Sequence, residues 1–212
     1  MNQNLRNFSS GLLFFLAIAI AIYGMSFFSF SVISINFLKT KEAAILKDGF
    51  WHFCFFYHIF CGSIALLSGV FQFSARLREK YTAFHRTLGK IYVLAILTGS
   101  PAAFYAAIYA NTGWVAGSGF SLLAIFWFIT TLFAFLTIRK KQINAHREWM
   151  TRSYALTLAA VSLRIILPSE LFFLHLNFST AYQIVAWACW IPNLLFAEWL
   201  IRSKSERDHS LA

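Results

Sequence analysis

Long apolar runs recur along the whole chain, and they constrain its fold more than any other feature. Several of them approach or exceed the ~20 residues that a helix needs to cross the hydrocarbon core of a bilayer. Only 12% of the residues are charged, whereas soluble domains carry roughly 25%. The sequence therefore predicts an all-α helical bundle in a membrane and excludes a soluble domain with a buried core.

The runs predict six transmembrane helices that form a single domain over residues 1–212. The expected spans are approximately 10–33, 50–73, 86–110, 120–138, 147–167 and 180–201. The first run is longer than the apolar region of a signal peptide, which has about 7–15 residues, so we expect a retained anchor helix. Pro168 is expected to close the fifth span, because proline has no backbone donor.

Lysine and arginine are distributed unevenly between the predicted loops. One side of the membrane holds 14 of them, whereas the other side holds only Lys39, Lys41 and Lys47. The richer side is expected to be cytoplasmic, which places both termini there and predicts a multi-pass protein of the inner (cytoplasmic) membrane. This topology accounts for the net charge of +10, so nucleic-acid binding is not expected.

The cysteines and the known catalytic motifs give little indication of chemistry. All three cysteines lie within apolar runs, and their odd number and spacing predict neither a disulfide framework nor a metal site. The chain has no nucleophile elbow, no phosphate-binding loop and no HExxH zinc motif. Whether the protein is an enzyme stays open on the sequence.

Two similar clusters begin the third and fifth predicted spans, "FHRTLGKIY" with His85 and "NAHREWMTRSY" with His146. Two neutral imidazoles at the same depth on parallel helices can hold a haem iron axially or bind a metal. Arg86 and Arg152 could then pair with the haem propionates at the membrane edge, as could Arg147. Alternatively, the histidines bind backbone or lipid, and the arginines face lipid phosphates.

Arg164 lies inside the fifth span, where a charged side chain costs about 2.5–3.5 kcal/mol on insertion scales. It is therefore expected to face the bundle interior or a wet cavity, with a carboxylate, an anionic ligand or backbone carbonyls as partner. The alternative is that it extends to the outer surface. On a continuous helix it would share a face with His146, whereas Glu198 is expected to lie too deep to pair with it.

His58 and Gln72 share a face of the second span with small residues. Together with Arg164 they could line a route or a pocket of the size of a quinone. The alternative for His58 is a buried imidazole that is hydrogen-bonded to a carbonyl of its own helix.

Residues 50–202 resemble the bacterial membrane proteins that are grouped as domain of unknown function 2306. The similar stretches are "YHIFCGSIALLSGVFQF", "FHRTLGKIY", "HREWMTRSYALTLAAVSLRIILP" and "WACWIPNLLFAEW". The resemblance implies a helical membrane fold without an assigned activity. It also singles out a set of polar positions: His58, Gln72, His85, Arg86, His146, Arg152, Arg164, Asn193 and Glu198.

A looser similarity connects the chain with b-type membrane cytochromes that reduce iron across a membrane. Such proteins have two histidine pairs, but the fourth span here has no histidine, so one haem or none is expected rather than two. The first functional hypothesis is thus an electron-transfer protein with one haem b between spans three and five and a quinone or respiratory-chain partner. The other two are a non-enzymatic accessory or assembly subunit of a respiratory complex, and a small anion or metabolite carrier that uses Arg164.

Overall fold

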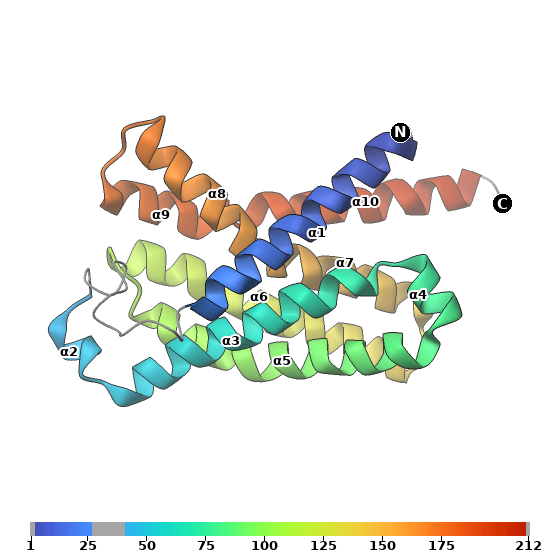
Figure 1. Ribbon diagram of the computed structural model, residues 1–212, viewed down its shortest axis with the longest axis horizontal. Helices are drawn as coiled ribbons and strands as arrows, with labels where there is room; N and C mark the ends of the chain where they lie inside the picture. The colour runs from blue at the N-terminus through green and yellow to red at the C-terminus, as the bar shows by residue number, and fades with distance from the viewer. Residues whose placement is uncertain (1–2, 27–40, 211–212) are drawn as a thin grey trace. The chain divides into compact units, whose positions relative to one another are not determined.

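The computed structural model describes residues 3–26 and 41–210, and all regular elements in these ranges are α-helices (Figure 1). Within this part of the chain, five helical segments are long and apolar enough to cross a membrane: Gly49–Gln72, Thr82–Ile108, Trp114–Arg139, Ile143–Phe172 and Phe178–Glu206. They correspond to the last five predicted spans, so the all-α, multi-pass prediction is confirmed to that extent.

The first predicted span, 10–33, is described only in part. Its described portion belongs to α1 (Gln3–Ser26), in which the apolar stretch Phe14–Ser26 is shorter than a full span. Residues 27–33, and Lys39 of the charge count, lie outside the described ranges. The sixth span and the orientation of the termini stay predictions.

The chain divides into two compact units, residues 1–102 and 103–212. Unit 1 contains α1, α2 (Ala43–Leu46), α3 (Gly49–Gln72), α4 (Ala75–Lys80) and most of α5 (Thr82–Ile108). Side-chain caps fix two of its helix starts. Asp48 accepts a hydrogen bond from Phe50 N at 2.9 Å ahead of α3, and Ser74 accepts one from Leu77 N at 3.3 Å ahead of α4.

Small residues bring the helices of unit 1 close together. A Cβ added at Gly24 of α1 would lie 2.7 Å from Ser63 Oγ, and one added at Gly99 of α5 would lie 2.5 Å from Cys61 Cβ, both on α3. Real Cβ atoms do not approach other atoms so closely, so a side chain at Gly99 requires the helices to separate, and one at Gly24 requires Ser63 to rotate or the helices to separate. Close backbone approach at small residues is a main source of helix association in membranes.

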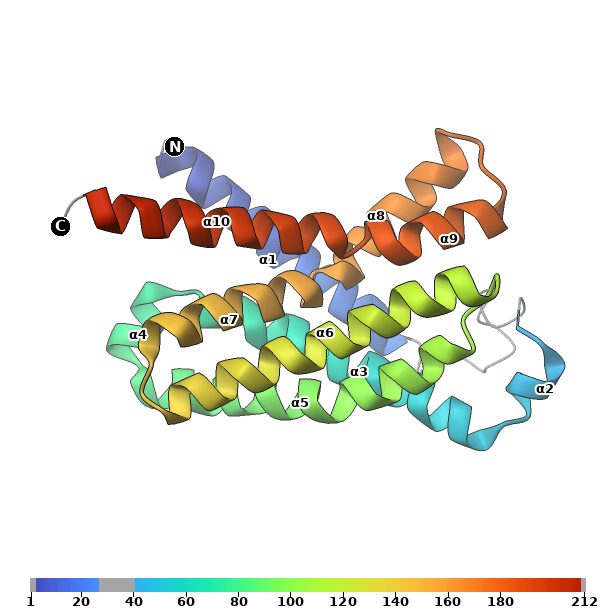
Figure 2. The same ribbon diagram turned by 180° about the vertical axis from the view of Figure 1, so that it is seen from behind.

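Unit 2 contains the end of α5 and the helices α6 (Trp114–Arg139), α7 (Ile143–Thr157), α8 (Ala159–Phe172), α9 (Phe178–Ala188) and α10 (Ile191–Ser210). Helix α6 packs against α7 and α9, α7 packs against α10, and α8 and α9 form a hairpin (Figure 2). A Cβ at Gly119 would lie 2.8 Å from Ala186 O, so this glycine sets the close approach of α6 and α9.

The fifth and sixth predicted spans are interrupted, which the sequence did not predict. The fifth is divided into α7 and α8 at Leu158, and the sixth into α9 and α10 at Cys189 and Trp190. The expectation that His146 and Arg164 share one continuous helix face was based on an unbroken helix. The interruption at Leu158 removes that basis.

The prediction that Pro168 ends the fifth span is wrong, because α8 continues through Pro168 to Phe172. Prolines are tolerated inside membrane helices when nearby hydroxyl groups satisfy backbone carbonyls. Ser169, the next residue, donates to Ile165 O at 2.7 Å in the same turn, whereas the carbonyl that loses its usual i+4 donor at Pro168 is that of Arg164. Ser100 likewise donates to Ile96 O directly before Pro101, which lies inside α5.

Candidate functional site

A seam of buried polar contacts joins α6 to α7 along the inside of unit 2. Trp127 Nε1 donates to Thr157 Oγ1 at 2.9 Å, and the hydroxyls of Thr131 and Ser153 lie 2.7 Å apart. The side chains of Thr131 and Ser153 are fully buried. We call these contacts, together with that of His146 described next, the α6–α7 seam.

His146 ends the seam near the start of α7. Its Nδ1 lies 2.8 Å from Ala134 O on α6, and because a carbonyl oxygen only accepts, the ring nitrogen donates. In the neutral imidazole this contact assigns the proton to Nδ1 and leaves the lone pair on Nε2. His146 is half-buried, so the seam holds its ring in one tautomer and one orientation.

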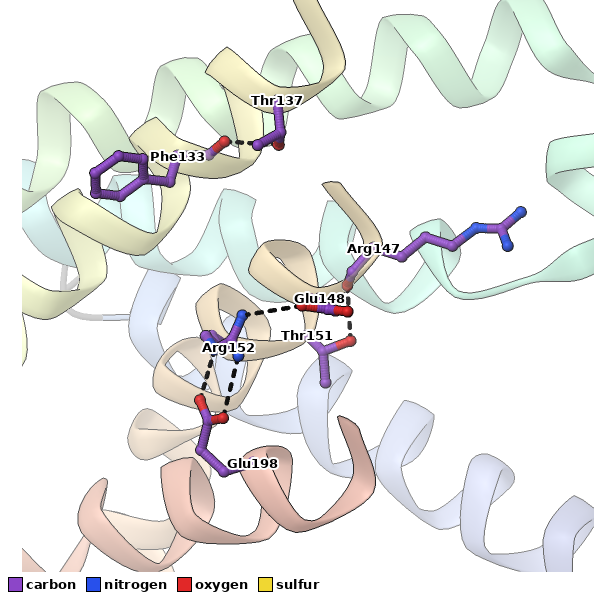
Figure 3. A network of polar contacts seen from close by, with 7 residues as sticks. All are labelled: Phe133, Thr137, Arg147, Glu148, Thr151, Arg152 and Glu198. Carbon is purple, nitrogen blue, oxygen red and sulfur yellow. Dashed lines mark hydrogen bonds and ion pairs between the residues drawn. The ribbon is translucent and has the colours of Figure 1, made fainter. Parts of the chain in front are cut away.

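Arg152 forms a two-point ion pair with Glu198 on α10 (Figure 3). Its Nε and one terminal nitrogen donate to the two carboxylate oxygens of Glu198 at 2.5 and 3.1 Å. Glu148 lies 3.8 Å from the third nitrogen, and the guanidinium lies 4.6 Å from the centre of the Trp149 ring. Arg152, predicted as a ligand contact, thus ties α7 to α10.

Arg147 differs from its neighbour Arg152, because its exposed side chain points away from the ion pair (Figure 3). Arg86, at the start of α5 in unit 1, is also exposed. Both positions agree with groups that contact lipid phosphates or an anionic group at the membrane edge.

Asn193 on α10 bridges the two helix interruptions of unit 2. Its Nδ2 lies 3.2 Å from Ala155 O, just before the break at Leu158, and 3.0 Å from Cys189 O at the other break. Its amide also exchanges hydrogen bonds with Ser162 on α8, at 3.0 and 3.1 Å. The family resemblance singled out Asn193, but its neighbours along the chain gave no indication of these contacts.

Helix α8 carries two ionisable side chains at membrane depth. Arg164 is half-buried and donates to Ala160 O at 2.8 Å, so a backbone carbonyl is one of its partners, as the sequence analysis allowed. Glu170 is only 6% exposed, and its Oε2 atom has no hydrogen-bond partner among the described residues. Ionisable residues within membrane spans are rare and are candidates for functional sites.

The predicted pocket of His58, Gln72 and Arg164 stays a prediction, because its residues are divided between the two units. Gln72 Nε2 donates to His85 O at 3.2 Å, so Gln72 joins α3 to α5 within unit 1. His58 Nδ1 donates to Cys54 O at 3.2 Å, which is the helix-carbonyl alternative that the sequence left open. Arg164 belongs to unit 2.

His85 and His146 belong to different units, and their pairing stays a prediction. His85 is half-buried in the first turn of α5, where Gln72 binds its backbone carbonyl. Within the described ranges, no group of three or more His, Cys, Asp or Glu side chains is arranged to hold a metal ion.

The sequence profile of DUF2306, a family described as predicted membrane proteins, matches residues 55–201. The chain belongs to the DUF2306 family. No curated protein matches the chain, and no solved structure does.

The DUF2306 match extends from α3 into α10 and includes all seven predicted site residues, whereas α1 and α2 lie outside it. Together with the five spanning segments it makes the protein a multi-pass integral membrane protein. The functional interpretation of this DUF2306 protein therefore depends on its own side chains.

Proposed function

We propose that this DUF2306 protein is a b-type cytochrome in which His146 and His85 are the axial ligands of one haem. The observation that supports it is the hydrogen bond from His146 Nδ1 to Ala134 O. Histidines that bind metals almost always donate their other ring nitrogen to a carboxylate or a backbone carbonyl. This contact orients the ring and leaves Nε2 as the ligand atom.

The other residues fit a haem better than a metal ion bound by protein alone. Two axial imidazoles are sufficient for haem, whereas a structural zinc ion is usually held by four side chains. The described residues provide no cluster of that kind. When bound, the haem would supply one-electron transfer, with its potential tuned by the axial ligands and their hydrogen bonds.

The arginines have separate roles in this proposal. Arg152 is held by both carboxylate oxygens of Glu198, so we assign it to the α7–α10 contact and not to the propionates. Arg86 and Arg147 each directly follow a proposed ligand and are exposed. They are the cations available to neutralise propionate charge at the membrane edge.

The test is an absorption spectrum of detergent-purified protein from haem-replete cells, air-oxidised and then reduced with dithionite. We expect a stoichiometric Soret band that sharpens on reduction and is lost in His146→Ala and in His85→Ala. The matched control is His52→Ala, because His52 Nδ1 bonds only a carbonyl of its own helix turn, at 3.1 Å from Asp48 O, and the band should persist.

A colourless wild-type protein, or a band that survives both ligand substitutions, would contradict the cytochrome proposal. If the colourless protein co-purified with a respiratory complex, the accessory-subunit hypothesis would be favoured instead.

A second candidate function, a carrier for a small anion, is favoured by the two interrupted helices. Transporters often place their substrate sites where membrane helices are interrupted. Here Asn193 joins both interruptions, and α8 adds the Arg164 guanidinium. A carrier should be stabilised thermally by its anion, and Arg164→Gln should abolish the stabilisation while Arg147→Gln preserves it. Equal stabilisation of both variants would contradict this function.

A further inference from the structure

A groove of about 540 Å³ lies on unit 2, between the start of α6 and the line from α9 into α10. Its volume is within the range of roughly 300–1,000 Å³ that is typical of small-molecule sites. The argument uses six of its lining residues: Val115, Thr180, Gln183, Ile184, Ala188 and Ile191. The five from α9 and α10 follow helical spacing and form one stripe, which continues across the interruption at Cys189 and Trp190.

Two hydrogen bonds fix the walls of the groove. Gln183 Nε2 donates to Thr112 O at 3.0 Å, and Trp187 Nε1 donates to Val115 O at 3.1 Å. Both hold α9 against the start of α6, where Gly119 permits the close approach. The groove therefore lies between helix segments that these two bonds hold together.

The polar and apolar residues of the groove are arranged in the same order as the polar surface and the apolar interior of a membrane. All six residues lie in the segments that are long and apolar enough to cross a bilayer, and none is charged. Thr180 and Gln183, the polar members, stand together at the start of α9, where the span begins. Ile184, Ala188 and Ile191 follow toward its middle. This order matches an amphiphile whose polar end is at the membrane surface.

The length of the groove indicates which kind of molecule occupies it. From Thr180 to Ile191 the stripe rises by about 16 Å along the helix axis. The hydrocarbon core of a bilayer is about 30 Å thick, so the groove covers about one leaflet. A transmembrane helix of a partner would need a contact surface across both leaflets, whereas a lipid tail needs only one.

We propose that this groove binds one acyl chain of a membrane phospholipid, with the glycerol end at Thr180 and Gln183 and the chain along Ile184, Ala188 and Ile191. The site is separate from the residues of the proposed haem site. The spectrum that tests the haem and the lipid measurement below therefore succeed or fail independently.

The test counts phospholipids on the detergent-purified full chain by native mass spectrometry, with Ala188→Trp as the variant that fills the groove. We expect one retained phospholipid per wild-type chain and at least a tenfold loss of the lipid-bound species in the variant. The matched control is Leu195→Trp. Leu195 is 64% exposed on α10 and lies outside the groove, so this variant should retain the lipid.

A second measurement keeps the proposal testable if Ala188→Trp does not fold. A phospholipid with a photoreactive acyl chain is reconstituted with the wild-type chain, and the cross-linked peptide is identified. Cross-links concentrated in residues 180–192 support the groove. Equal lipid retention in both variants, cross-links spread evenly over all spans, or a retained quinone or protein in place of the phospholipid would overturn it.

Discussion

The two units of the molecule hold their helices together in different ways. In unit 1, α3 meets α1 and α5 at glycines, with Gly24 against Ser63 and Gly99 against Cys61. In unit 2, side chains make the connections, through the α6–α7 seam, the Arg152–Glu198 pair and the Asn193 bridge. Unit 1 also contains the bond from Gln72 to His85 O, and unit 2 the close approach at Gly119, so the units differ in degree: the tightest approaches described lie in unit 1 and the more extensive polar contacts in unit 2.

The difference has a physical origin in the solvent. Lipid tails are as apolar as leucine, so the burial of apolar side chains contributes little free energy to the association of membrane helices. Association then comes from dispersion at small residues or from hydrogen bonds between helices. Unit 1 should therefore be most sensitive to added atoms, and unit 2 to lost hydrogen bonds.

The largest expected effect is that of Gly99→Ala in unit 1. Its new Cβ would lie 2.5 Å from Cys61 Cβ, so α3 and α5 must separate, at a cost of roughly 1–3 kcal/mol or more. Thermal unfolding in detergent should show a clear drop in Tm. Gly62→Ala on α3 is the control, since a Cβ there meets nothing within 4 Å. Equal Tm values for both variants would remove close approach as the basis of unit 1.

The next largest effect is expected for the ion pair of unit 2. Charge-assisted hydrogen bonds contribute roughly 1.5–3 kcal/mol, and the side chains of Arg152 and Glu198 are 17% and 33% exposed, so solvent screens part of this. Arg152→Gln and Glu198→Gln should each lower Tm, and the double variant should lose less than the sum. Arg147→Gln should change little. Additive losses in the double variant would show that the two groups are not coupled.

A smaller effect is expected inside the α6–α7 seam. Thr131→Val keeps the shape of the side chain but removes its contact with Ser153, and such interhelical bonds in membranes average about 0.6 kcal/mol. The control is Thr151→Val, because Thr151 donates only within its own helix, to Arg147 O. Denaturant titration should show a loss of stability for Thr131→Val alone. An equal loss of stability in Thr151→Val would indicate that the lower helix propensity of valine causes the loss, and not the contact between α6 and α7.

A final effect, which depends on pH, is expected for Lys41 of unit 1, which lies over the Trp51 ring much as Arg152 lies over Trp149 in unit 2. Burial lowers the pKa of Lys41 from 10.5 to about 8, although nearby Glu42 opposes the shift. The unfolded chain then binds more protons between pH 8 and 10.5, so stability should rise with pH in this window. Below pH 8 the full cost of burying the charge is present.

The measurement for Lys41 is the difference in Tm between wild type and Lys41→Met at pH 7 and pH 9.5. The Tm of the wild type relative to that of Lys41→Met should be higher at pH 9.5 than at pH 7. The other lysines and the tyrosines are present in both chains, so their contribution to the pH dependence cancels in this difference. A difference that does not change with pH would show that Lys41 keeps its ordinary pKa.

The sequence predicted features that depend on neighbours along the chain. Hydropathy located the last five spans to within a few residues, and the carbonyl contact of His58 is a bond within one helix turn. The expected end at Pro168 was wrong, although the prediction was local, because a proline removes one backbone hydrogen bond and α8 continues through it to Phe172. The interruption at Leu158 had no glycine or proline as a signal, whereas Pro192, two residues after Trp190, was a signal for the second interruption that the prediction did not use.

The sequence could not predict the contacts between helices, and the reason is different. Arg152 and Glu198 were both singled out, yet their pairing depends on α7 and α10 lying side by side, which helical periodicity does not reveal. Gln183 and Trp187 were missed altogether, because a tryptophan or glutamine near a membrane surface is ordinary until its donor is seen to hold another helix.

Membrane insertion is encoded by the amino acids alone, because the transfer of each segment into lipid is nearly a sum over its own residues. Family membership is likewise a property of the linear sequence, here of residues 55–201. The choice of partners for His146, Arg152 and Asn193, and the shape of the groove along α9, were decided by the packing of helices that are distant in the chain. In a solvent that satisfies no backbone or side-chain polar group, those partners are fixed only when the helices meet.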